Sequence, residues 1–180
     1  MGNDTNFITG LRVVTESLNN GQFSRAEAIA RRLTINYAHV PLSWALLGQS
    51  LQKLRRFDES WHATRTAIAL KPADAKTCHI LALTLDSLNE CIIAEELCEK
   101  AVNLQSENVE FILFLAKLNL KIKNFAKADK LFQNAIILSN NDLTIHVEIS
   151  KAYKDARLNS DSSVALNRAI ELAAIAMISN

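Results

Sequence analysis

The chain has 180 residues, of which 49% are hydrophobic and 22% are charged, a balance typical of a soluble globular protein rather than a disordered one. Its formal net charge is +1, so no strong overall field favours a nucleic acid or an anionic membrane as a partner. We therefore expect no nucleic-acid partner. No apolar run approaches the ~18 residues that a membrane helix needs, and the first residues lack the basic and apolar stretches of a signal peptide. We therefore expect no membrane insertion.

Residues 1–6 are polar and too short to cover a core, so we expect a disordered N-terminal tail. From residue 7 onward the chain repeats every 34 residues, in the units 7–40, 41–74, 75–108, 109–142 and 143–176. One repeated column holds small side chains: Ala26, Ser60, Ala94, Ala128 and Ser162. Another holds aliphatic side chains: Val13, Leu47, Leu81, Leu115 and Ile149. A period of this length is typical of stacked supersecondary units, none of which could bury its apolar face alone.

Within each unit, apolar residues recur at helical spacing in two stretches. In the second unit the first stretch carries Trp44, Leu47, Gly48 and Leu51, and the second carries Phe57, Trp61, Thr64, Ala67 and Ile68. A short turn at 54–56 separates the two stretches. Gly21 marks the same turn in the first unit, where glycine most easily adopts a left-handed helix end, and Asn124 lies near it in the fourth. Each unit is therefore predicted to be a hairpin of two helices of about 14 residues.

Capping residues agree with this division of the chain. Asp74, Asn108 and Asp142 each end a unit, at the point where the next helix needs an N-cap. Ser24 and Glu27 have the spacing of a capping box, which predicts that the second helix of the first unit begins there.

At these positions the chain resembles the tetratricopeptide-repeat (TPR) family. The second unit carries the fullest match, in Trp44, Leu47, Gly48, Leu51, Ser60, Thr64, Ala67 and Pro72. The family prefers an aromatic residue where Leu51 and Thr64 stand, and alanine where Ser60 stands. The resemblance implies an all-α fold, a right-handed α-solenoid of five TPR hairpins with about ten antiparallel helices, forming one domain over residues 7–180.

Small side chains have a physical reason in such a fold, because a large one would force the two helices of a hairpin apart. A second close-contact column supports this interpretation, in Ala67, Ala101, Ala135 and Ala169. The first unit departs from it, with Leu33 in place of alanine.

The resemblance also implies that the first helix of each unit lines a concave groove that binds a peptide or protein segment. The residues expected in the groove are Arg12, Gln49, Gln52, His79, Leu83, Leu113, Phe114, Lys117, Leu120, Lys151 and Lys154. Aliphatic and aromatic members beside several lysines favour an acidic segment with apolar anchors as the partner. The alternative is that the apolar members pack between adjacent first helices and that the lysines form a solvated face.

No pattern in the sequence indicates catalysis. Cys91 and Cys98 lie in columns that hold Phe or Thr elsewhere, which predicts core positions rather than a redox pair. The four histidines share no metal-binding spacing, and no phosphate loop or nucleophile motif is present. We therefore expect no enzyme activity, no metal and no cofactor. An odd count of three cysteines without metal-type spacing favours a reducing compartment, with the cytoplasm as the default.

The C-terminal end is apolar on most sides, from Ala173 to Ile178. An apolar end of this kind indicates that another surface covers it: a second copy, a partner protein, or further chain in a longer polypeptide. Self-association is expected to use Ile170, Ala174, Met177 and Ile178. The sequence thus favours a non-catalytic interaction scaffold. It leaves two alternatives open, the N-terminal TPR region of a larger bacterial enzyme such as a glycosyltransferase or sulfotransferase, and a self-assembling scaffold.

Overall fold

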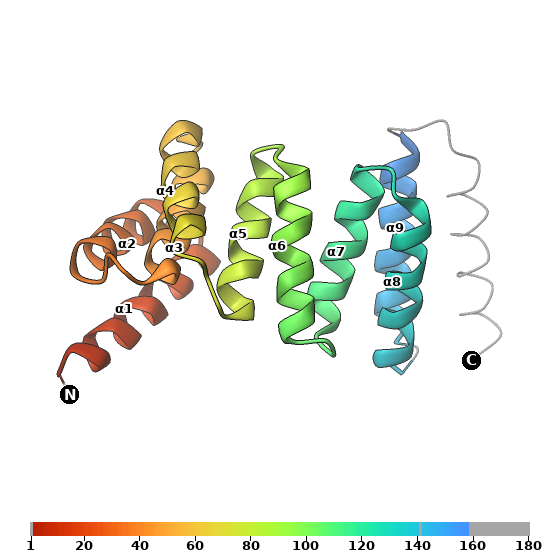
Figure 1. Ribbon diagram of the computed structural model, residues 1–180, viewed down its shortest axis with the longest axis horizontal. Helices are drawn as coiled ribbons and strands as arrows, with labels where there is room; N and C mark the ends of the chain where they lie inside the picture. The colour runs from red at the N-terminus through yellow and green to blue at the C-terminus, as the bar shows by residue number, and fades with distance from the viewer. Residues whose placement is uncertain (1, 141, 159–180) are drawn as a thin grey trace. The chain divides into compact units, whose positions relative to one another are not determined.

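The structure, a computed structural model, describes residues 2–140 and 142–158, and every regular element within them is a helix (Figure 1). In chain order these are α1 (Gly2–Asn19), α2 (Phe23–Asn36), α3 (Pro41–Lys53), α4 (Phe57–Ala69), α5 (Ala75–Ser87), α6 (Cys91–Leu104), α7 (Val109–Lys121), α8 (Phe125–Leu138) and α9 (Leu143–Leu158). The helices follow the predicted pairing, two to each of the first four repeats of 34 residues and α9 in the fifth. The second helix expected in the fifth unit, and the residues Ile170, Ala174, Met177 and Ile178, lie outside the described residues.

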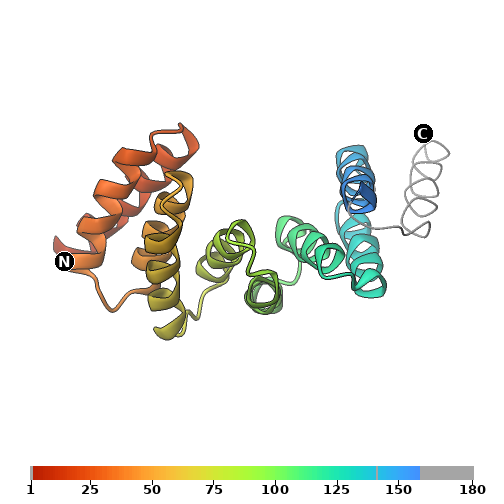
Figure 2. The ribbon, with the colours of Figure 1, turned by 90° about the horizontal axis from the view of Figure 1, so that it is seen from above.

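The chain divides into two compact units, residues 1–101 and 102–180, and the division falls near the end of α6. In the first compact unit, residues 1–101, α1 packs on α2 and α3 packs on α4, as the view from above shows (Figure 2). Helix α3 also contacts α2 and α5, so it lies inside the unit. The buried core of this unit runs through Val14, Leu33, Leu47, Leu51 and Leu81.

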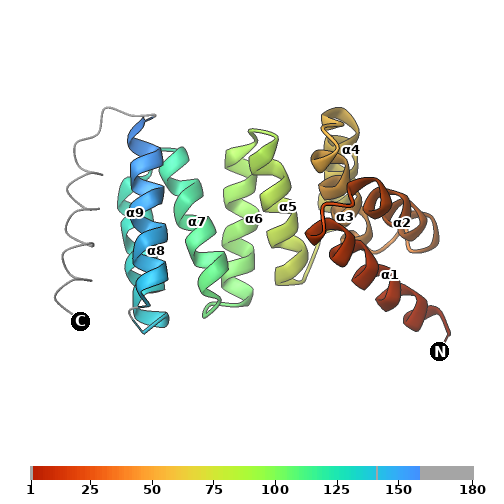
Figure 3. The same cartoon turned by 180° about the vertical axis from the view of Figure 1, so that it is seen from behind.

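The second unit is built on the α7–α8 hairpin, against which α9 packs (Figure 3). Ile112, Phe132, Ile149 and Tyr153 are each no more than 2% exposed and form its core. The rings of Phe132 and Tyr153 lie 5.2 Å apart between centroids, and the Tyr153 hydroxyl donates a hydrogen bond to Asp129 Oδ1. An aromatic pair and a polar tie thus fix α9 to α8.

The small column lies where the helices of a hairpin cross, and its described members are all fully buried: Ala26, Ser60, Ala94 and Ala128. In the second hairpin the two helices approach closely, and Ser60 Oγ donates to the carbonyl oxygen of Gly48 at 2.7 Å. A Cβ added to Gly48 would lie 2.6 Å from Thr64 Oγ1. Serine therefore replaces the alanine typical of the family and adds a hydrogen bond between α3 and α4.

Leu33, the exception in the second small column, has a compensating partner. A Cβ added to Gly10 on α1 would lie 2.8 Å from Leu33 Cδ2, so the leucine fills the space that a side chain at residue 10 would need. The first hairpin therefore exchanges the positions of its large and small residues and keeps the helices close.

The ends of the helices confirm some of the predicted caps and correct others. Asp74 accepts a hydrogen bond from Thr77 N at 2.8 Å and Asn108 accepts one from Phe111 N at 3.2 Å, so both cap the helix that follows. The capping box predicted at Ser24 is wrong, because α2 already begins at Phe23 with Gln22 as its N-cap. The turn after α1 has closed by then, through a hydrogen bond from Gln22 N to Ser17 O.

Two further predictions are corrected at the turns and at the N-terminus. Gly21 has the expected left-handed backbone, with φ of 71°. In the fourth 34-residue repeat, however, Lys123 rather than Asn124 is left-handed. Asn124 is instead the N-cap of α8. Helix α1 begins at Gly2, so residues 2–6 are helical rather than a disordered tail. The ring of Phe7, 4.6 Å from that of Tyr37 between centroids, holds this end of α1 against the end of α2.

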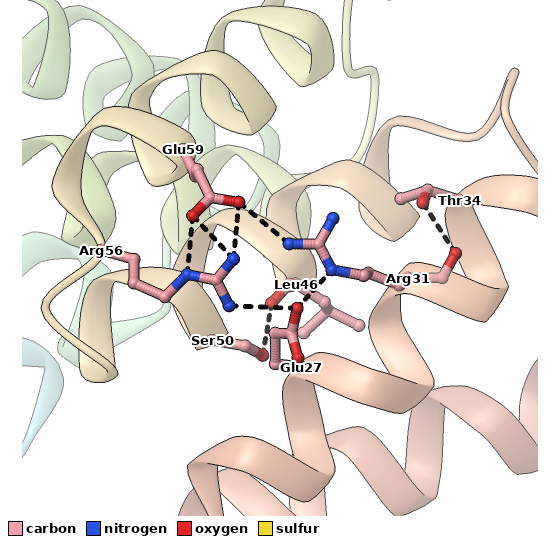
Figure 4. Close-up of polar contacts among 7 residues, drawn as sticks. All are labelled: Glu27, Arg31, Thr34, Leu46, Ser50, Arg56 and Glu59. Atoms are coloured by element: carbon pink, nitrogen blue, oxygen red, sulfur yellow. Dashed lines mark hydrogen bonds and ion pairs between the residues drawn. The ribbon is translucent and has the colours of Figure 1, made fainter.

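A charged network joins the first two hairpins on the surface of the first unit (Figure 4). Arg56 binds both carboxylate oxygens of Glu59 at 2.6 and 2.7 Å, and Arg31 Nη2 reaches Glu59 Oε2 at 3.0 Å. Arg31 also pairs with Glu27 in the preceding turn of α2, and Arg56 Nη1 lies 3.5 Å from the same Glu27. Hydrogen bonds from Arg56 and then Arg31 lower the pKa of Glu59, and those to Glu27 and then Glu59 raise the pKa of Arg31.

Candidate partner-binding site

In the first compact unit, residues 1–101, the residues expected in the groove lie on α1, α3 and α5. Arg12 is exposed and forms an ion pair of 3.8 Å with Glu16, while Gln49 and Gln52 are half-buried. Leu83 on α5 is also half-buried, but His79 is only 6% exposed and offers a partner little surface. The exposed part of this face is therefore polar, with Leu83 as its apolar member.

In the second compact unit, residues 102–180, a pocket of about 690 Å³ opens between α7 and α9. Its lining residues are Lys117, Leu120, Lys121, Lys123, Thr144, Val147, Glu148, Lys151, Ala152, Asp155 and Ala156. The first helices of the fourth and fifth repeats, α7 and α9, form this pocket, and Figure 3 shows these two helices. A surface between first helices is the kind of site that the resemblance to TPR proteins implies.

The two walls of the pocket differ in charge. The wall from α7 and the turn after it carries only basic charged residues, Lys117, Lys121 and Lys123. The wall from α9 carries Lys151 together with the acids Glu148 and Asp155. Lysines therefore outnumber carboxylates around the pocket, which favours an acidic ligand.

Apolar surface lies beside these charges. Val147 on α9 is 61% exposed, so most of this aliphatic side chain is open to a partner. Ala152 is half-buried one turn further along α9, and Leu120 from α7 is 4% exposed. A partner could thus cover an aliphatic side chain while its charged groups meet the lysines.

One ion pair spans the pocket, from Lys117 Nζ on α7 to Glu148 Oε1 on α9. The Lys117 side chain is 35% exposed and the Glu148 side chain is 43% exposed. Pairs with this much solvent contact contribute between about 0.2 and 1 kcal/mol to stability, so water or another ion can replace either member at small cost.

Of the residues expected in the groove, the pocket brings together Lys117, Leu120 and Lys151. Leu113 and Leu120 are each 4% exposed and belong to the apolar core of the second unit, so packing between helices accounts for most of their surface. Phe114 is half-buried and Lys154 is exposed, and neither lines the pocket.

Sequence reasoning missed other lining residues, such as Lys123 and Asp155. Lys123 lies in the turn after α7, outside the helical positions that a repeat pattern assigns to the groove. Asp155 follows Lys151 by four residues on α9, so helical periodicity places both on one face. That spacing was the available signal for extending the site along α9.

The next features are possible metal-binding clusters and the cysteine thiols. Among them, no cluster of three or more His, Cys, Asp or Glu side chains could hold a metal ion. Cys78 and Cys98 are fully buried, and burial raises the pKa of the Cys78 thiol and raises that of Cys98 to about 12. Both are therefore thiols at neutral pH and weak nucleophiles. None of the described helices combines the length and the apolar character needed to cross a membrane.

No family model matches the sequence, and no curated protein is similar to it by sequence. Solved structures are similar over most of the chain. PilF from Pseudomonas aeruginosa has a TM-score of 0.73 at 17% identity, over 98% of this chain and 78% of that one. A MamA protein has a TM-score of 0.68 at 14% identity, over 98% of this chain and 92% of that one. YrrB, a TPR protein with an unusual peptide-binding site, has a TM-score of 0.64 at 12% identity, over 91% and 84%. These likenesses confirm an all-α fold of the TPR kind.

Proposed function

We propose that this chain is a non-catalytic scaffold that binds a segment of a partner protein, with the pocket between α7 and α9 as the main contact. The observation that carries the proposal is this pocket of about 690 Å³, lined by α7 and α9, the first helices of two successive repeats. The peptide-binding site of YrrB, a protein of the same fold, supports it.

The partner segment that fits the pocket is acidic and carries an aliphatic side chain. Its carboxylates would meet Lys151 and the lysines of the α7 wall, and its aliphatic group would cover Val147. The attraction between these lysines and the carboxylates of the partner accelerates association and becomes weaker as salt is added. The apolar contact supplies affinity that salt does not screen.

A random peptide library displayed on phage, selected with the full chain, tests the proposal. We expect enriched peptides to be acidic with an aliphatic residue, and Val147→Asp to weaken their binding about tenfold or more, because it removes an apolar contact and adds a repelling charge. Ile137→Asp is the matched control, since Ile137 is an exposed aliphatic residue on α8, outside the pocket, at 72% exposure.

Binding would be measured by isothermal titration calorimetry with synthetic copies of the enriched peptides, after circular dichroism has established that each variant is folded. Equal affinities for Val147→Asp, Ile137→Asp and the unaltered chain would contradict the pocket as the site. Enrichment of basic or uncharged peptides would contradict the acidic partner.

A further inference from the structure

Two charged side chains of the pocket are already paired with each other in the absence of a partner. Lys117 Nζ on the all-basic wall contacts Glu148 Oε1 on the opposite wall. An incoming carboxylate that approaches Lys117 therefore meets a lysine whose charge is neutralised, with a second carboxylate beside it.

On the premise that the pocket binds an acidic segment, we propose that Glu148 is a specificity-determining residue that makes the site select segments with more than one carboxylate. A single partner carboxylate that replaces Glu148 at Lys117 exchanges one ion pair for another of the same kind. Because both members of the existing pair are substantially solvated, this exchange is close to neutral in free energy.

Net attraction must then come from other lysines of the lining, such as Lys123 and Lys151. Lys151 lies on the α9 wall and Lys123 in the turn after α7, so a segment with several acids can contact more of these lysines than a singly acidic segment can. Glu148 thus penalises weakly acidic segments, which is how an internal competitor produces discrimination between ligands.

The pocket contains a built-in control for this role. Asp155 lines the same pocket on the same helix and carries the same charge, but among the described residues it forms no ion pair with Lys117. Glu148→Gln and Asp155→Asn therefore raise the charge of the pocket by the same amount, and only the first releases Lys117.

The experiment compares two synthetic peptides, the most strongly enriched acidic peptide from the library and a version in which all but one carboxylate is replaced by the corresponding amide. We expect Glu148→Gln to tighten binding of the singly acidic peptide about two- to fivefold, and Asp155→Asn to tighten it less. In a Lys117→Met background, Glu148→Gln should no longer have the larger effect.

Equal gains from Glu148→Gln and Asp155→Asn would overturn the proposal, because they would indicate a general charge effect. A gain from Glu148→Gln that persists unchanged with Lys117→Met would overturn it as well. These results leave the binding function intact, whereas failure of the unaltered chain to bind any acidic peptide would reject the proposed function itself. Thermal melts of each variant establish that the compared proteins are equally folded.

Discussion

Single residues in the turns between paired helices adopt the same unusual backbone at intervals of 34 positions. Gly21, Arg55, Asn89 and Lys123 all have positive φ, between 61° and 71°. Glycine adopts this left-handed conformation without steric penalty, whereas a residue with a Cβ pays roughly 1–2 kcal/mol. The same hairpin geometry is thus enforced by glycine in one turn and by the rest of the packing in the others.

This difference predicts opposite effects of substitution at two equivalent positions. We expect Gly21→Ala to lower the free energy of unfolding by about 1 kcal/mol, because a Cβ there touches nothing within 4 Å and its whole cost is the backbone strain. Arg55→Gly should raise it by several tenths of a kcal/mol, since relief of strain outweighs the added freedom of the unfolded chain. Urea unfolding followed by circular dichroism measures both, and equal signs for the two variants would contradict the argument.

Residue patterns predicted the close crossings, but not how each crossing is completed. The small column gave the sites where helices approach, and its described members are buried. The pairing of Leu33 with Gly10 was not predictable, because the two residues lie in different columns and only their contact explains both. His79 shows the same limit, since its position on the repeat predicted a groove residue and its neighbours bury it to 6% exposure.

At the scale of whole helices, packing surfaces are joined by charges as well as by apolar contact. The network of Glu27, Arg31, Arg56 and Glu59 links α2 of the first hairpin to the start of α4 in the second (Figure 4). Glu59 accepts hydrogen bonds from both arginines, which is why its pKa is lowered. The ion pairs of Glu59 with the two arginines therefore contribute stability only while Glu59 is ionised.

The sign of its pH dependence follows from that lowered pKa. The contribution of Glu59 is fully present above the pKa of an unfolded glutamate and is lost as the pH falls through the lower folded value. We expect Glu59→Gln to destabilise the protein at neutral pH, and the difference from the unaltered chain to shrink as the pH falls below about 4. Thermal melts over a pH series measure this difference.

Asp58→Asn is the matched control, because Asp58 lies in the same first turn of α4 but outside the network. It removes the same charge from the same helix end, so it reports the interaction with the helix dipole alone. If Asp58→Asn and Glu59→Gln destabilise the protein equally at every pH, the arginines contribute nothing specific. Raised salt should diminish the Glu59→Gln effect, as expected for exposed ion pairs.

Helix existence was predictable from the sequence, and helix ends and lining residues were less so. Periodic apolar residues identified the paired helices, and Asp74 and Asn108 identified two N-caps. Ser24 failed as a cap because closure of the preceding turn, rather than a side chain, sets the start of α2. Lys123 was missed at the pocket because a position in a turn has no helical period to place it.

On the scale of the whole molecule, stability is distributed rather than centralised. The two compact units each have an apolar core of their own, one around Leu47 and Leu81 and the other around Ile112 and Phe132. In a repeat protein, stability is approximately a sum of terms for single repeats and for neighbouring pairs. Loss of packing in one repeat is therefore felt most by that repeat and the next.

This distribution predicts a local response to equivalent core substitutions in the two units. Ile80 on α5 is 7% exposed and Ile112 on α7 is fully buried, so replacing either with valine removes one methyl group from a core at a cost of about 1 kcal/mol. Hydrogen exchange read by mass spectrometry reports the opening of each helix separately. We expect Ile112→Val to reduce protection about fivefold in α7, α8 and α9 while α2 and α3 keep theirs, and Ile80→Val to reduce protection around α3 and α5 instead.

A uniform loss of protection through every helix, produced alike by both variants, would mean that the chain unfolds as one cooperative body. The nearest-neighbour account of its stability would then be wrong, although the fold and the pocket would stand.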